Sequence, residues 1–173
     1  KARRQSEFPD VRRPQREVWV EPTIADLLQF EREFIRSAKR LSIDIETKGN
    51  QITCIGFAPS PSLAIVIPIY DPSKPDGNYW RTHSDEMTVW SIIRRWLDLP
   101  LPKVFQNGMY DMTFLWRSYG IKTNIAFGDD TMLLHHALQP EMEKGLGFLG
   151  TLYTDEASWK FMRTKHDTVK RED

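Results

Sequence analysis

The chain has 173 residues, and its 24 basic and 24 acidic side chains give a formal net charge of zero. A hydrophobic fraction of 40% is typical of a globular protein rather than a disordered one. No apolar run approaches the ~20 residues that a membrane-spanning helix needs, so we expect no membrane partner. The single cysteine, Cys54, excludes a disulfide framework, and no signal peptide is recognisable, so we expect a cytoplasmic protein.

The N-terminal residues 1–17 form a basic segment rich in arginine and proline. We expect an irregular, solvated arm there, and a DNA-contacting tail is the alternative. Residues 18–20 are compatible with a short strand. Thr23 is the expected N-cap of a helix, with Asp26 as its capping-box partner, and the apolar spacing extends that helix to about Ala38.

Three strands are predicted next, at residues 40–46, 51–58 and 62–69. Turn signals separate the first from the second and the second from the third. Short turns between consecutive strands favour an antiparallel meander. The loop that follows, 71–82, is rich in proline, aspartate and glycine.

Helices and short strands alternate in the rest of the chain. The predicted elements are a helix at 84–97, a strand at 103–106, a helix at 110–119 ended by Gly120, a strand at 125–127, and helices at 130–138, 146–152 and 156–164. Periodicity alone therefore predicts an α/β or α+β protein.

Two carboxylates lie on one face at the end of the first meander strand. Because strand side chains alternate, Asp44 and Glu46 share a face, opposite Leu41, Ile43 and Ile45. Burying unpaired charges costs several kcal/mol, so the pair indicates a bound cation. Oxygen ligands favour hard ions such as Mg²⁺ or Mn²⁺. Taken alone, the pair is also compatible with a solvated strand end.

A third carboxylate, Asp111, strengthens the metal-site interpretation. It follows the short apolar run 103–105 and lies at the start of a predicted helix. Open α/β sheets place their chemistry at such strand-to-helix junctions. We therefore expect Asp111 to join Asp44 and Glu46 in one site.

Three segments carry a resemblance to a known family. Asp44-Ile45-Glu46, followed by residues 106–111 (Gln-Asn-Gly-Met-Tyr-Asp), resembles the first two motifs of the DEDD 3′–5′ exonucleases. The segment 129–138, with its Asp-Thr-Met-Leu run, resembles a helix in the exonuclease domains of family A DNA polymerases. Residues 145–160 are similar to phage-type members. Together the segments extend over residues 40 to 160.

The resemblance implies a fold and a reaction. The fold would be α/β, an RNase H-like mixed five-stranded sheet flanked by helices, with the exonuclease domain spanning 18–173. The reaction would be proofreading hydrolysis at the 3′ end of single-stranded DNA, with release of nucleoside monophosphates. The implied partner is a C-terminal polymerase domain of the parent chain, in the cytoplasm of a bacterial or phage-infected cell.

The resemblance also implies roles for five residues. Two ions, Mg²⁺ or Mn²⁺, would lie about 3.5–4 Å apart at the scissile phosphate. Asp44 would bridge both ions, Glu46 would bind the ion on the nucleophile side, and Asp111 would hold the second ion through water. Thr47 would give its backbone N–H to the 3′-hydroxyl. Asn107 would contact the terminal nucleotide, with a turn or capping role as the alternative.

Other polar and aromatic residues are predicted to be structural. We expect Tyr110 to pack in the core and Asp130 to cap its own helix, with a role as fourth metal ligand as the alternative. His135 and His136 cannot share a helix face, so structural or surface roles are expected for both. Lys160 is expected to be solvated.

The family's third motif, Tyr-x-x-x-Asp or His-x-x-x-x-Asp, does not occur in the 173 residues. Since the chain also begins with a lysine, we interpret it as a piece of a longer protein truncated before that motif. The missing motif would supply the fourth acidic ligand, so we expect the piece alone to be weak or inactive.

Two other functions remain open. The first is a free-standing exonuclease similar to RNase D, acting on RNA or DNA ends. The second is a non-catalytic, exonuclease-like scaffold that positions DNA or a partner. The presence of Asp44, Glu46 and Asp111 argues against the scaffold, because it has no use for repelling carboxylates held together.

Overall fold

The computed structural model describes residues 15–125 and 128–154. These divide into two compact units, Gln15–Thr131 and the described residues from Met132 onward. Most of the predicted basic arm lies outside the described residues, as do Lys160 and the helix predicted at 156–164.

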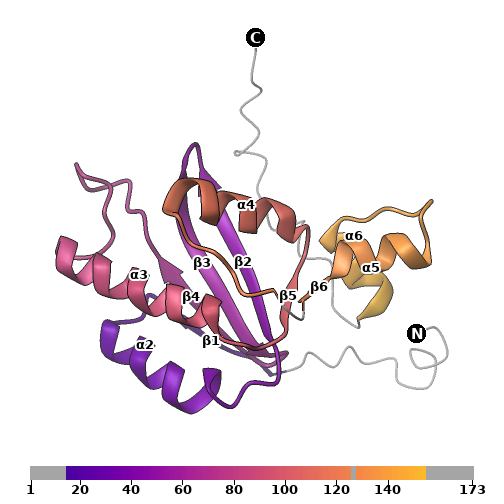
Figure 1. Ribbon diagram of the computed structural model, residues 1–173, viewed down its shortest axis with the longest axis horizontal. Helices are drawn as coiled ribbons and strands as arrows, with labels where there is room; N and C mark the ends of the chain where they lie inside the picture. Colours follow the sequence, from indigo (N-terminus) through magenta and orange to yellow (C-terminus); the bar gives the residue numbers. More distant parts are fainter. Residues whose placement is uncertain (1–14, 126–127, 155–173) are drawn as a thin grey trace, which may run out of the picture. The chain divides into compact units, whose positions relative to one another are not determined.

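The larger unit is built on one mixed, six-stranded sheet with the order β1-β4-β3-β2-β5-β6 (Figure 1). The predicted meander is confirmed, because β3 pairs antiparallel with both β2 and β4. The other three pairings, β1–β4, β2–β5 and β5–β6, are parallel. The strands are β1 (Glu17–Val20), β2 (Leu41–Lys48), β3 (Gln51–Ser60), β4 (Leu63–Pro68), β5 (Lys103–Phe105) and β6 (Gly128–Asp130).

The α/β prediction with an RNase H-like mixed sheet is thus confirmed, with one strand more than expected because β1 joins the edge beside β4. The last strand lies at Gly128–Asp130 rather than at 125–127, and residues 126–127 are outside the described ranges. Pairing with β5 sets its position. A Gly-Asp-Asp strand has no apolar side chain that periodicity could detect.

The first helix begins where the sequence predicts. Helix α2 (Ile24–Phe30) opens with a capping box in which Thr23 and Asp26 exchange hydrogen bonds. The helix then widens into a π-helical turn, η1 (Glu31–Ile35), and ends before the predicted Ala38. In this turn Glu31 is 5% exposed, and its carboxylate accepts hydrogen bonds from Arg95 and from the indole N–H of Trp96. These partners satisfy a buried charge that would otherwise be costly.

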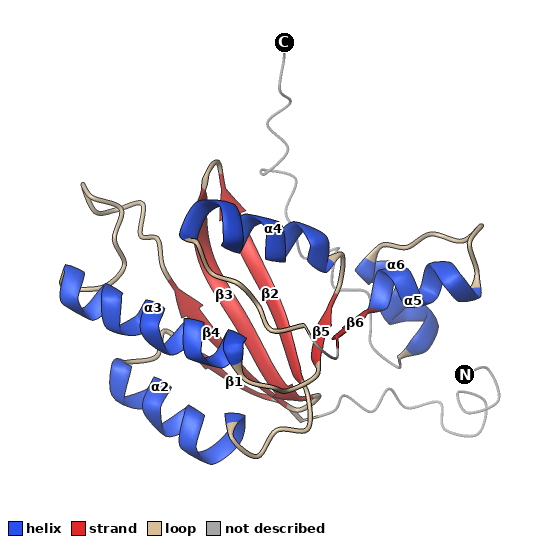
Figure 2. Ribbon diagram, viewed as in Figure 1, coloured by secondary structure: helices blue, strands red, loops and turns tan. Residues whose placement is uncertain are grey.

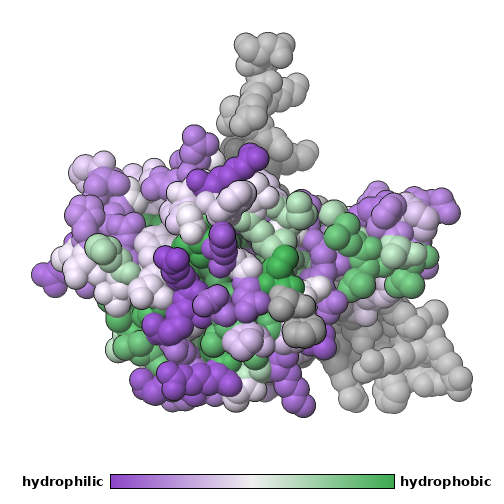
Figure 3. Space-filling view, in the orientation of Figure 1, coloured by the Kyte–Doolittle hydropathy of each residue, from purple (hydrophilic) through white to green (hydrophobic). Residues whose placement is uncertain are grey.

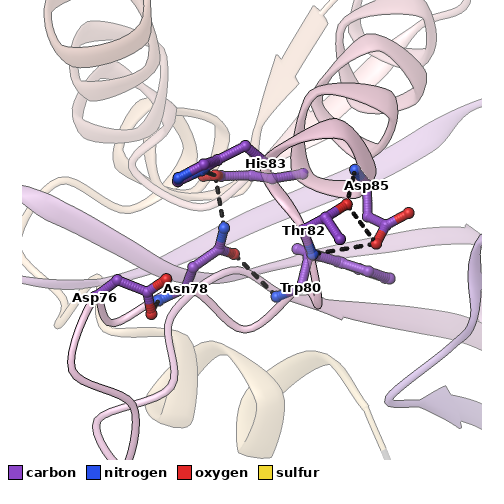
Figure 4. Close-up of polar contacts among 7 residues, drawn as sticks. Asp76, Asn78, Trp80, Thr82, His83 and Asp85 are labelled. Carbon is purple, nitrogen blue, oxygen red and sulfur yellow. Dashed lines mark hydrogen bonds and ion pairs between the residues drawn. The ribbon is translucent and has the colours of Figure 1, made fainter.

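The loop after β4 is ordered by its own polar side chains (Figure 4). The side chain of Asn78 accepts from Trp80 N at 2.9 Å and donates to Glu86 at 2.8 Å. A second capping box, formed by Thr82 and Asp85, then starts helix α3 (His83–Asp98). The predicted loop and the predicted helix at 84–97 are confirmed.

The two faces of the sheet differ. Leu41, Ile43 and Ile45 are buried in one core cluster with side chains of α2, α3 and α4 (Gly108–Tyr119), which lie together over the sheet in Figure 2. The alternate residues of β2, Ser42, Asp44 and Glu46, are exposed on the other face. Strand alternation therefore separates the core from the carboxylates, as predicted.

The smaller unit contains helix α6 (Leu146–Tyr153) and most of α5 (Thr131–Leu138). Its interior centres on His135, which is 2% exposed and lies 2.8 Å from the hydroxyl of Tyr153 through Nδ1. His136 is exposed. The structural and surface roles expected for the two histidines are confirmed. Exposed leucines occur on both helices, at Leu133, Leu134, Leu138 and Leu146. Figure 3 shows green side chains beside purple ones in this region.

None of the helices in the described ranges is long and apolar enough to span a membrane.

Candidate active site

The first two carboxylates of the site stand on β2. Asp44 pairs in register with Gly56 and Glu46 with Cys54, so their neighbours on β3 are small. The register shifts between Glu46 and Thr47. Such bulges re-aim side chains and are common beside active sites. The strand therefore presents two carboxylates beside small neighbours, immediately before its pairing register shifts.

Asp111 reaches the same strand from α4. Its side chain is 4% exposed, and its Oδ1 atom accepts a hydrogen bond from Ile45 N at 2.9 Å. Strand β5 pairs with β2 only at Leu41 and Ser42, so it ends before Ile45. The Asp111 carboxylate satisfies the backbone N–H beyond that point. Asp111, although 66 residues further along the chain, is thereby fixed to the backbone of β2 at Ile45, the residue between Asp44 and Glu46.

The site concentrates negative charge. Burial is the largest of the causes that raise the pKa of Asp111 to about 6; the charges of Asp44 and Asp130 act in the same direction, and the hydrogen bond from Ile45 N opposes them. Partial burial, and then the charge of Glu46, raise the pKa of Asp44. Raised carboxylate pKa values report that the ionised forms lack a compensating cation. Divalent ion binding would supply that compensation.

The donors fit a hard divalent ion bound in part by water and substrate. Within residues 15–125 and 128–154, no group of three or more His, Cys, Asp or Glu side chains is arranged to hold an ion by itself. Mg²⁺ commonly takes one or two carboxylates and completes its shell with waters and phosphate oxygens. Carboxylates at Asp44, Glu46 and Asp111 match that chemistry, so the metal role of the three stays a prediction consistent with the fold.

Tyr110 belongs to the edge of this site, and the prediction that it packs in the core is wrong. It is 49% exposed, and its hydroxyl lies 2.5 Å from Thr47 Oγ1. Helix α4 begins at Gly108, two residues earlier than predicted, and its buried residues, Gly108, Asp111 and Leu115, recur every three to four positions. Tyr110 lies off that buried face. The sequence signal for a place at the site is that Tyr110 directly precedes Asp111. The contact links Thr47 to α4.

A tight backbone turn joins β5 to α4. Asn107 adopts a left-handed conformation with φ of +62°, and its exposed side chain makes no capping hydrogen bond. Asn107 is therefore the N-cap residue by its backbone position, but its side-chain amide makes no hydrogen bond to the helix N-terminus. Gly108 is buried, and a Cβ atom there would lie 2.5 Å from Cβ and Cγ of Phe105.

Gly108→Ala is expected to lower the free energy of unfolding by about 1–3 kcal/mol, because the added methyl overlaps the buried Phe105 ring. The improved helix propensity of alanine does not offset that clash. Urea denaturation measures the effect. Gly145→Ala is the control, since a Cβ atom at Gly145 meets nothing within 4 Å. Equal stability of the two variants would contradict the close approach.

Asp130 caps a different helix from the one expected. The prediction placed it at the start of its own helix, but its two carboxylate oxygens accept from Asn107 N at 3.1 Å and from Gly108 N at 2.7 Å. The cause is the sheet: β6 pairs with β5 and sets Asp130 opposite Phe105, beside the first turn of α4. These two hydrogen bonds direct the carboxylate to the start of α4, which favours the capping role over the alternative role of a fourth metal ligand.

Comparisons with known proteins give a match in structure and none in sequence. No family model and no curated protein matches the chain. Escherichia coli RNase D, described as an exoribonuclease involved in structured RNA processing, is similar over 87% of this chain and 36% of its own, with 16% identity and a TM-score of 0.60.

Two further nucleases share the fold. Brucella melitensis NrnC with bound Mg²⁺ matches with 16% identity and a TM-score of 0.51 over 83% of this chain and 62% of NrnC. The Aedes aegypti Nibbler EXO domain matches with 12% identity and a TM-score of 0.53 over 78% of this chain and 67% of that domain. The chain thus spans about three fifths of NrnC and about a third of RNase D. At these identities, the comparisons show that the chain shares the RNase H-like α/β fold of these structures.

Proposed function

We propose that the chain is a metal-dependent 3′–5′ exonuclease domain, extending over residues 18–173, with its active centre at Asp44, Glu46 and Asp111. One observation carries the proposal. The buried Asp111 carboxylate binds Ile45 N, between the two acidic residues of β2. The charge of Glu46 raises the pKa of Asp44, and the charge of Asp44 raises the pKa of Asp111. Such repulsion between neighbouring carboxylates is more typical of a functional site than of a structural one.

Some residues of the site bind the metal ions and others bind the substrate. Asp44, Glu46 and Asp111 would hold Mg²⁺ or Mn²⁺. When bound, such ions supply hydroxide near neutral pH and neutralise charge at the scissile phosphate. The backbone N–H of Thr47 binds the terminal 3′-hydroxyl, and the Asn107 amide contacts the terminal nucleotide. Tyr110 steadies Thr47 through the hydroxyl contact.

The finer proposal is a proofreading domain of a family A, phage-like DNA polymerase. The segments 129–138 and 145–160 support it through their resemblance to such domains. Its substrate is then the 3′ end of single-stranded DNA, its partner a C-terminal polymerase domain in the parent chain, and its place the cytoplasm. A free-standing nuclease acting on RNA is the second candidate, and the TM-score of 0.60 with RNase D favours it.

Degradation of 5′-labelled single strands tests the activity and separates the two candidates. DNA and RNA oligonucleotides with free or blocked 3′ ends are incubated with Mg²⁺ or Mn²⁺. Two proteins are compared: the 173-residue chain and a longer chain that adds a Tyr-x-x-x-Asp segment. We expect stepwise shortening from free 3′ ends, strongest in the longer chain and with DNA.

Preference for RNA would favour the RNase D-like candidate. Failure of both proteins to shorten either strand would reject the exonuclease proposal and favour a scaffold that only binds nucleic acid.

A further inference from the structure

The turn between β5 and α4 is held from outside by two consecutive residues, Asp130 at the end of β6 and Thr131 at the start of α5. Asp130 accepts hydrogen bonds from the backbone N–H groups of Asn107, the N-cap residue, and Gly108, the first residue of α4. Helix N-termini leave such N–H groups without intrahelical partners and favour negative charge. An N-cap side chain usually satisfies them, but Asn107 makes no side-chain cap bond. Asp130 takes over that function from a different strand.

Thr131 holds the other side of the same turn. Its hydroxyl donates to Phe105 O at 3.0 Å and also contacts the side-chain amide of Gln106. Phe105 is the last residue of β5, and the next residues lead directly into α4. Asp130 and Thr131 therefore fix both the exit from the strand and the entry into the helix.

Two residues of the proposed site depend on this turn to different degrees. Asp111 lies in the first turn of α4 and has a second anchor at Ile45 N. Asn107 holds a left-handed backbone that costs a non-glycine residue roughly 1–2 kcal/mol, and its N–H is bound by Asp130. Its side chain is exposed. Loss of the Asp130 carboxylate should therefore disturb Asn107 more than Asp111.

We infer that Asp130 is a positioning residue that presents the Asn107 amide to the terminal nucleotide, with Thr131 as its support. The inference rests on the proposed function in one respect, the assignment of Asn107 to nucleotide contact. Asp130 itself touches neither metal nor substrate. It acts by holding a backbone conformation that leaves the Asn107 side chain available.

A double-mutant cycle on oligonucleotide binding tests this role. The probe is a 5′-fluorescein single-stranded oligodeoxynucleotide with a free 3′-hydroxyl, followed by anisotropy with Ca²⁺ in place of Mg²⁺. The variants are Asp130→Asn, Asn107→Gly and the double variant. Asn107→Gly removes the amide and keeps the left-handed turn, because glycine adopts positive φ without strain. Asp129→Asn is the control, since it makes the same charge change at the exposed neighbouring residue.

We expect Asp130→Asn to weaken binding about tenfold and Asp129→Asn to leave it unchanged. In the Asn107→Gly background the effect of Asp130→Asn should fall below about twofold, because residues that act together are not additive. Thr131→Val should weaken binding, and Thr131→Ser should restore it. A purely structural role would weaken binding by the same factor in both backgrounds, and that result would overturn the inference.

The outcomes also separate this inference from the proposed exonuclease activity. Coupled binding effects without nucleotide release would uphold the positioning role and reject the activity. Nucleotide release together with additive effects of the two substitutions on binding would uphold the activity and reject the positioning role. Failure of the unsubstituted chain to bind the oligonucleotide would overturn the positioning role directly.

Discussion

In the longer chain that adds a Tyr-x-x-x-Asp segment, Asp44→Asn is expected to reduce nucleotide release at least about a thousandfold, since a metal-binding carboxylate supplies several kcal/mol of transition-state stabilisation. The folded state should not lose stability. Partial burial and the neighbouring Glu46 raise the pKa of Asp44, so its ionised form is unfavourable in the metal-free protein. Rates of 3′-end shortening measure the first effect and urea denaturation the second.

Glu33→Gln is the matched control for this loss. Glu33 is an exposed carboxylate on η1, and its neutralisation should leave both the rate and the stability unchanged. If Asp44→Asn retained more than about a tenth of the activity, Asp44 would not be a metal ligand. If it lost activity only in parallel with unfolding, the effect would be structural.

Asp111→Asn is expected to remove activity and yet raise the free energy of unfolding at pH 7.5 by about 2 kcal/mol. The pKa of Asp111 is raised to about 6 in the folded protein, above the ordinary value of a carboxyl group. Folding therefore favours the protonated form. The stability contributed by this group is complete below about pH 4 and is lost as the pH rises through about 6. Asparagine keeps the acceptor for Ile45 N and carries no charge.

Urea denaturation between pH 4 and 8, in EDTA, measures this difference. The two stability curves should meet near pH 4, diverge as the pH rises towards 6, and stay a constant distance apart above that, with the asparagine variant the more stable. Asp129→Asn, an exposed neutralisation in β6, should show no such separation. A less stable Asp111→Asn at pH 7.5 would mean that the ionised carboxylate stabilises the fold, which would contradict its raised pKa.

Much of the fold and the acidic cluster follows from local sequence patterns. Alternation along β2 separates Asp44 and Glu46 from the core residues Leu41, Ile43 and Ile45. The turns at both ends of β3 give the meander. The strand-to-helix junction before Asp111 places that residue beside β2, beyond the end of β5.

The features that were missed depend on contacts between distant segments. Strand β6 contains no apolar residue, and only its pairing with β5 creates it. The same pairing directs Asp130 to α4 instead of to its own helix. Tyr110 is exposed because the buried face of α4 passes through Asp111 and Leu115, and Asp111 faces inward only through its long-range contact with Ile45 N.

The most direct measurement is a crystal structure of the protein soaked with Mn²⁺, with the ions located by their anomalous scattering. We expect Mn²⁺ in contact with the carboxylate of Asp44, with Glu46 and Asp111 as its neighbouring ligands, directly or through water. Saturating Mn²⁺ that binds elsewhere and leaves Asp44 and Asp111 without an ion would contradict the assignment of the active site.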